Sequence, residues 1–114
     1  SKMQVSRAEL RAPSIHEAFE RYYRKNRNTA TLRSVAELLE RLVRGRLLSP
    51  KNTELVLSKM ERIETGDSRL KAGLPNDIRF AQKTGTQVRR ICNFGVVRKA
   101  AIESNVLIAA CVKN

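Results

Sequence analysis

The stretch TGDSRLKAGLPNDIRFAQKTGTQVRRICNFGVVR, residues 65–98, contains the change of pattern that decides the fold. Within it, Gly73-Leu74-Pro75-Asn76-Asp77 combines residues that favour a turn. Beyond this turn the apolar residues lose helical spacing and form short runs typical of strands. We expect strands at 78–83, 91–98 and 105–112, with residues 85–90 as the hairpin connection between the first two. The third run is almost continuously apolar, which indicates a strand covered on both faces.

Upstream of the turn, the spacing of apolar residues predicts three helices. Ser14-Ile15-His16-Glu17 has the form of a capping box and opens the first helix. The second runs from about Leu32 to Arg44, and Gly45 is a natural stop. Ser49-Pro50 opens the third, because a serine cap followed by proline suits the first helical position.

The third helix is expected to bury one stripe, made of Val56, Met60 and Ile63, and to close at Thr65-Gly66-Asp67. Helices followed by an antiparallel meander predict an α+β fold. The organisation expected is one partial domain, 1–114. Its residues 1–72 are mainly helical, and its residues 73–114 form the antiparallel strands.

Length and composition exclude a membrane-spanning chain. The protein has 114 residues, of which 41% are hydrophobic, enough for a core in one domain. No run of 18 apolar residues exists, so no membrane span is expected. The first eleven residues are polar and lack the apolar stretch of a signal peptide, so any export signal is expected to lie upstream or to have been removed.

The net charge of +12 favours anionic partners, and nucleic acid is the commonest of these. The basic residues, however, are spread along the whole chain. The densest cluster, residues 21–27, is also the polar end of the first predicted helix. A solvated helix face is therefore the preferred interpretation, and a small module binding nucleic acid or an acidic partner is the alternative.

The two cysteines and the single histidine fit no metal site. Cys92 and Cys111 follow neither a zinc pattern nor a CxxC motif, and both lie in apolar strand-like runs. Mostly buried free thiols on adjacent strands are the default interpretation, and a disulfide between neighbouring strands is the alternative. His16 lies on the polar side of its helix and is expected at the surface. We expect no metal and no cofactor.

Lys83-Thr84-Gly85-Thr86 follows Thr65-Gly66-Asp67 and Arg69-Leu70-Lys71-Ala72-Gly73-Leu74-Pro75 in an order that is much more specific than the triplet alone. This string resembles the segment of class A β-lactamases, penicillin-recognising serine hydrolases, that leads into the Lys-Thr-Gly strand of the active site. The likeness covers residues 27–112. It implies an acyl-enzyme hydrolase of β-lactams or related amides, periplasmic or secreted if the chain follows the habit of the family.

The resemblance implies a substrate-binding site at Lys83, Thr84, Gly85, Thr86, Arg89 and Arg90. Glycine leaves room for a substrate backbone beside the strand. A threonine hydroxyl, a lysine and a bidentate arginine suit a substrate carboxylate. The backbone N–H of Thr86 would complete an oxyanion hole with one from the nucleophile.

The nucleophile is missing from this pattern. No Ser-Asp-Asn occurs in the chain, and the one Ser-x-x-Lys, Ser68 to Lys71, leads into a helix-ending sequence. We expect no catalytic residue in this chain and no hydrolysis by the chain alone. Asn28 also stands where the family usually has an aspartate, so we expect the omega loop of this family to be rebuilt here. A β-lactamase-like protein that only binds a ligand is a further alternative.

The expected partners follow from these interpretations. They are a β-lactam-like or carboxylate-bearing substrate and, for the apolar strand edge, the rest of the parent protein or a second copy. Nucleic acid is the second choice.

Overall fold

The computed structural model describes residues 14–98 and 105–114. The chain divides into two compact units, residues 1–31 and 32–114. Three helices precede a short 3-10 helix and a three-stranded antiparallel sheet, which confirms the predicted α+β class. The arrangement as one partial domain stays a prediction. No helix among the described residues is long and apolar enough to cross a membrane.

The first unit contains α1, Ile15–Arg24. As predicted, the Ser14 side chain caps it by accepting from the Glu17 backbone N–H at 3.2 Å. Its buried face is formed by Ala18, Tyr22 and Tyr23. His16 is exposed, as the sequence predicted.

The second unit begins with α2, Leu32–Val43, and α3, Pro50–Glu61. Ser49 caps α3 as predicted, accepting from the Asn52 backbone N–H at 3.2 Å. The prediction of which α3 residues form the buried stripe is wrong. Thr53 and Leu57 are the buried residues, whereas Val56, Met60 and Ile63 are only half-buried. Ile63 also lies beyond the end of the helix, which closes at Glu61 rather than at Thr65-Gly66-Asp67.

The strands are β1, Arg79–Gln87, β2, Arg90–Arg98, and β3, Val106–Lys113, in the order β1-β2-β3. Three consecutive antiparallel strands are thereby confirmed. The predicted connection at 85–90 is wrong, because Gly85, Thr86 and Gln87 pair with Cys92, Ile91 and Arg90 and extend the ladder. The turn is reduced to Val88 and Arg89, and Arg89 adopts a φ of 59°.

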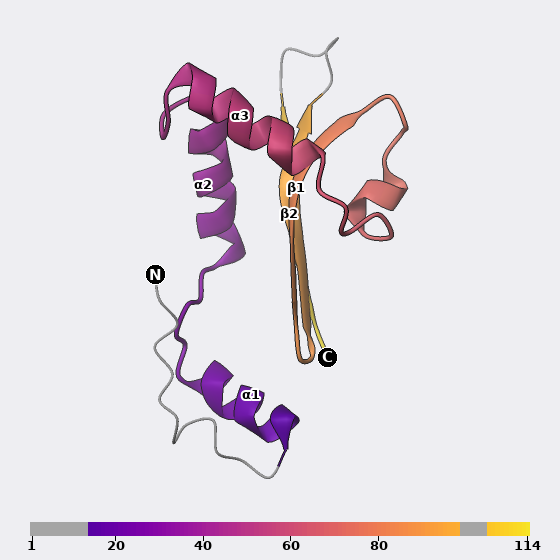
Figure 1. The fold of residues 1–114 in the computed structure, drawn as a ribbon. Helices are drawn as coiled ribbons and strands as arrows, with labels where there is room; N and C mark the ends of the chain where they lie inside the picture. Colours follow the sequence, from indigo (N-terminus) through magenta and orange to yellow (C-terminus); the bar gives the residue numbers. More distant parts are fainter. Residues whose placement is uncertain (1–13, 99–104) are drawn as a thin grey trace. The chain divides into compact units, whose positions relative to one another are not determined.

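One face of the sheet carries the core, in which Leu39 of α2 and Leu57 of α3 pack with Ala81 and Val96 of the sheet. Figure 1 shows α2 and α3 on this side of the strands and the connection from α3 to β1 on the other. That connection contains the 3-10 helix η1, Leu70–Gly73. The sheet is thus a central layer between two helices and an irregular segment.

The third strand is less covered than its composition predicted. Its Val106 and Val112 are 55% and 67% exposed, and Ile91, the register partner of Val112, is 45% exposed. Among the described residues, therefore, nothing covers β3 on both faces.

Cys92 and Cys111 are direct register partners on β2 and β3, as predicted, but they form a disulfide with an S–S distance of 2.01 Å. The default interpretation of free thiols is therefore wrong, and so is their burial. Cys92 is half-buried and Cys111 is exposed. A Cα–Cα separation of 4.1 Å brings the two side chains close enough for the bond.

Candidate functional site

Lys83-Thr84-Gly85-Thr86 lies in β1, at the edge of the sheet. Within residues 14–98 and 105–114, β2 is the only strand that pairs with it. A two-residue connection makes Gln87 and Arg90 a hydrogen-bonded pair, and such pairs alternate along an antiparallel ladder. The backbone N–H and C=O groups of Thr86 and Thr84 therefore point to the open edge. An extended ligand can add to the sheet there.

The side chains of this motif alternate between the two faces of the sheet. Lys83 and Gly85 face the same side as their partners Phe94 and Cys92, which is the side of the helices. Lys83 is exposed, and its Nζ donates to the carbonyl oxygen of Thr84. A Cβ at Gly85 would meet no atom closer than the Cys92 Cβ at 3.8 Å. The edge at Gly85 is thus open on the side where a ligand backbone would approach.

The opposite face of β1 is covered by the 65–70 segment, which runs from Thr65 to Leu70. The hydroxyls of Thr65 and Thr84 share a hydrogen bond at 2.8 Å. Gly66 has a φ of +83°, and a Cβ there would lie only 2.6 Å from the Thr84 Cγ2. Only glycine satisfies both the backbone conformation and the space. The segment is therefore seated directly against the second residue of the motif.

Arg69 is the arginine that the structure brings to the Lys-Thr-Gly strand. Its Nη2 donates to the Thr86 hydroxyl at 2.5 Å, and its Nη1 donates to the Cys92 and Gly85 carbonyl oxygens at 3.1 and 3.4 Å. One planar guanidinium thus bridges β1 and β2. Arg69 was not among the site residues predicted from the sequence, although it opens the Arg69–Pro75 string that carries the resemblance.

Arg89 and Arg90, the arginines selected from the sequence, lie at the hairpin end. Arg89 is exposed in the turn. Arg90 opens β2, is half-buried, and pairs in register with Gln87 and Lys113. It therefore faces the same side of the sheet as Lys83, and not the side of Thr84 and Thr86. A role of either arginine in ligand binding stays a prediction.

A buried polar pair supports the motif from within the sheet. Gln82 and Asn93 are only 1% and 4% exposed, and the Asn93 Nδ2 donates to the Gln82 Oε1 at 3.1 Å. Asn93 lies opposite Thr84 in the register. Neither residue was predicted from the sequence. The available signal was a polar side chain inside an apolar strand, which requires partners when buried.

Ser68 and Lys71 do not form a nucleophile and base at the start of a helix. Ser68 is exposed in the turn before η1, and that four-residue helix has no side-chain cap. The Lys71 Nζ instead donates to the Asp67 Oδ1 at 3.2 Å. That this Ser-x-x-Lys spacing is accidental stays a prediction.

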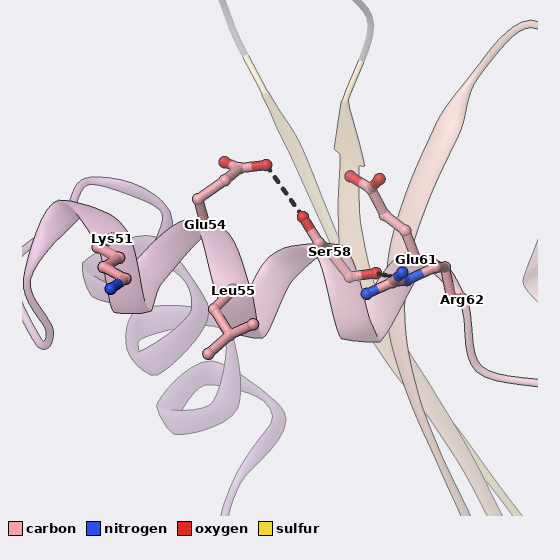
Figure 2. Close-up of a pocket in the computed structure, with 6 residues that line it drawn as sticks. All are labelled: Lys51, Glu54, Leu55, Ser58, Glu61 and Arg62. Carbon is pink, nitrogen blue, oxygen red and sulfur yellow. Dashed lines mark hydrogen bonds between the residues drawn. The ribbon is translucent and has the colours of Figure 1, made fainter.

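A concave surface on α3 contains no residue of the Lys-Thr-Gly motif. It is lined by Lys51, Glu54, Leu55, Ser58, Glu61 and Arg62. Figure 2 shows Ser58 donating to Glu54 and Arg62 donating to the Ser58 carbonyl oxygen, so its polar groups largely satisfy one another. Glu54 also accepts from Arg98 at 3.1 Å, and Arg98 chiefly lowers the pKa of that carboxyl. The surface is the outer part of an ion-pair cluster that ties α3 to the sheet.

That cluster joins two arginines that face each other in the ladder, Arg79 of β1 and Arg98 of β2. Glu61 pairs with Arg79 at 2.8 Å. The Arg98 Nη1 and the Glu61 Oε1, both buried, pair by charge at 2.8 Å without the geometry of a hydrogen bond. In the part of the chain that the structure describes, no group of three or more His, Cys, Asp or Glu residues forms a metal site.

Comparison with known proteins gives the family. A family model described as "Beta-lactamase enzyme family" matches residues 1–114. A "Beta-lactamase" of Mycobacterium tuberculosis (strain ATCC 25177 / H37Ra) is 40% identical over 60 residues, which are 53% of this chain and 20% of that protein. The chain therefore spans about a fifth of the length of this relative.

Solved structures give the same result for the fold. A mutant of the class A β-lactamase of the last common ancestor of Gram-negative bacteria matches with a TM-score of 0.72 and 30% identity, over 76% of this chain and 33% of that one. The protein PBP-A matches with a TM-score of 0.67 and 31% identity, over 79% of this chain and 33% of that one. About three quarters of this chain thus matches one third of a class A β-lactamase structure, and the chain belongs to the β-lactamase enzyme family.

Proposed function

We propose that this chain supplies the carboxylate-recognising side of a serine hydrolase that acts on β-lactams or related amides. The observation that carries the proposal is the Arg69 guanidinium, hydrogen-bonded to the Thr86 hydroxyl beside the open edge of Lys83-Thr84-Gly85. A β-lactam carries a carboxylate next to its reactive amide. The Arg69 guanidinium and the Thr86 hydroxyl suit that group from one face of the β1 edge, and Lys83 would add a positive charge from the other face.

The edge of β1 would bind the rest of the substrate. The outward N–H groups of Thr84 and Thr86 can pair with an extended amide, and the missing Cβ at Gly85 leaves room for its backbone. When a nucleophile attacks the amide carbonyl, the carbonyl oxygen becomes negative. The Thr86 N–H would stabilise it together with a second donor from the nucleophile's own backbone.

The nucleophile itself would come from a part of the family fold outside this third. Its hydroxyl oxygen would bond to the carbonyl carbon, the amide C–N bond would break, and the leaving nitrogen would take up a proton. The exposed apolar residues of β2 and β3, Ile91, Val106 and Val112, support a covering partner, either the remainder of the fold or a second copy. The proposal assigns binding to this chain and chemistry to that partner.

The first test uses the purified 114-residue chain with a chromogenic β-lactam, and mass spectrometry for a covalent adduct. We expect neither turnover nor adduct. Hydrolysis, or an adduct on Ser68 that disappears in Ser68→Ala, would show that the chain holds its own nucleophile and contradict the division of roles.

The second test measures non-covalent binding of benzylpenicillin by backbone NMR. We expect benzylpenicillin to shift the amide resonances of residues 85 and 86. We expect its affinity to fall several-fold in Lys83→Ala and in Gly85→Ala. The matched control is Gly73→Ala, since a Cβ at Gly73 meets nothing within 4 Å and the residue lies outside β1. Binding that is unchanged in both site variants would remove the assignment.

A further inference from the structure

Asn93 is a buried amide in the middle of β2, and it contacts both the Lys-Thr-Gly strand and the residue that follows Arg69. We propose that Asn93 is a positioning residue that holds the Arg69 guanidinium at the edge of the Lys-Thr-Gly strand. The inference rests on the proposed function of that strand in binding a carboxylate. It assigns to Asn93 no contact with the substrate.

Both polar atoms of the Asn93 amide have hydrogen-bond partners. Its Oδ1 accepts from the Leu70 backbone N–H at 3.2 Å. Its Nδ2 donates to the Gln82 Oε1 at 3.1 Å and to the Lys83 carbonyl oxygen at 3.3 Å. The side chain is 4% exposed, so water does not replace these partners easily. One amide therefore ties β2, β1 and the 65–70 segment together.

The position of Leu70 explains why this bond controls Arg69. Leu70 is the next residue along the chain, so an anchored Leu70 nitrogen fixes the point from which the Arg69 side chain leaves the backbone. The other end of the segment is held by the Thr65–Thr84 hydrogen bond and by the close packing of Gly66. Between these anchors, Arg69 reaches Thr86 and Cys92.

The chemistry of the amide separates positioning from general support of the fold. Asn93→Ala removes both the acceptor for Leu70 and the donors to Gln82 and Lys83. Asn93→Asp keeps the acceptor for Leu70, and Gln82 can rotate its amide to present Nε2 to the new carboxylate. Both variants lose stability. Only the alanine variant releases Leu70.

The first measurement is NMR relaxation of the Arg69 side-chain Nε–H in the full chain, without ligand. We expect an ordered guanidinium in the unmutated chain and in Asn93→Asp, and a mobile one in Asn93→Ala with the sheet amides still protected. The control is Asn76→Ala, in the exposed turn before β1, which leaves Arg69 ordered. An Arg69 side chain that stays ordered in Asn93→Ala would contradict the proposal.

Should Asn93→Ala fail to fold, hydrogen exchange of the unmutated chain decides the matter. The Leu70 amide should then exchange as slowly as the amides in the ladder of β2, because a buried acceptor holds it. Fast exchange at Leu70, or a mobile Arg69 in folded Asn93→Asp, would overturn the proposal.

The second measurement is a double-mutant cycle with benzylpenicillin as the probe. We expect Asn93→Ala to weaken binding about tenfold, and to have no further effect in an Arg69→Ala background. Equal losses in both backgrounds would mean that Asn93 acts independently of Arg69, and would overturn the inference. Equal binding by the unmutated chain and Arg69→Ala would instead refute the proposed function, while the relaxation measurement still decides whether Asn93 positions Arg69.

Discussion

Arg69 and Thr86 are 17 residues apart in the sequence, and the Arg69 Nη2 donates to the Thr86 hydroxyl at 2.5 Å. Through this bond the segment after α3 is attached to the C-terminal end of β1. The same guanidinium binds the Cys92 carbonyl oxygen of β2. The Lys-Thr-Gly strand is therefore held by a side chain from outside the sheet. The contribution of this side chain to stability can be tested without a substrate.

Replacing Arg69 with lysine should lower the free energy of unfolding by about 1 to 2 kcal/mol. A lysine keeps the charge, but its single nitrogen cannot reach Thr86 and Cys92 with the fixed geometry of a guanidinium. Urea unfolding followed by circular dichroism measures the change. The matched control is Arg62→Lys, because Arg62, the residue after α3, is exposed and its side chain donates to the nearby Ser58 carbonyl oxygen of that helix. Equal losses in the two variants would contradict the special role of Arg69.

Gly95→Ala should destabilise the fold by about 3 kcal/mol or more, whereas Gly73→Ala should be nearly neutral. A Cβ at Gly95 would lie 2.3 Å from the Ala81 carbonyl oxygen and 2.9 Å from the Gln82 Cα, and backbone atoms cannot move aside cheaply. A Cβ at Gly73 would meet nothing within 4 Å. Thermal unfolding of both variants measures the difference. A stable Gly95→Ala variant would mean that β1 and β2 are not packed as described.

Local signals predicted the elements of this fold well. The Ser14 and Ser49-Pro50 caps, and the change of period after Gly73, rest on interactions between near neighbours in sequence, so they could be recognised without a structure. The buried stripe of α3 was harder to predict from the sequence. Threonine is not expected in a core, because burying an unpaired hydroxyl costs free energy. The Thr53 hydroxyl avoids this cost because it donates to the Leu48 carbonyl oxygen.

Only the residues of the candidate site that lie in β1 could be predicted from the sequence. Lys83-Thr84-Gly85-Thr86 was selected from the sequence, and the structure places these residues on one edge strand. Arg69 was missed because its approach depends on the path of the 65–70 segment across the sheet. The sequence could not decide whether the two cysteines form a disulfide, for a related reason. Cysteines in apolar strands fit either a buried thiol or a bridge until the register aligns Cys92 with Cys111.

The disulfide predicts that denatured but unreduced protein contains no reactive thiol. Iodoacetamide should therefore add no mass in denaturant alone and two adducts after reduction. Replacing both cysteines with serine should cost about 3 kcal/mol, since the bridge closes a loop between residues 19 positions apart. Urea unfolding under non-reducing conditions measures the loss. Labelling of denatured, unreduced protein would show free thiols and contradict the bridge.

The last prediction concerns the pH dependence of the ion-pair cluster. Arg98 donates to the Glu54 carboxylate, and this bond together with its positive charge lowers the pKa of Glu54 from the ordinary value of 4.5. A lowered pKa in the folded state means that folding favours the ionised carboxylate. The stabilisation is thus complete above the unfolded pKa and is lost as the pH falls through the folded pKa.

The unmutated chain should therefore lose more stability than Glu54→Gln between about pH 6 and about pH 3, because the amide cannot titrate. Urea midpoints across this range give the comparison. The control is Glu64→Gln, an exposed glutamate for which residues 14–98 and 105–114 provide no ion pair. It should follow the unmutated chain at every pH. The effect should also shrink in high salt, since Glu54 is 57% exposed and its pairing with Arg98 is screened by ions. Parallel pH profiles for Glu54→Gln and the unmutated chain would mean that Arg98 does not bind Glu54 in solution.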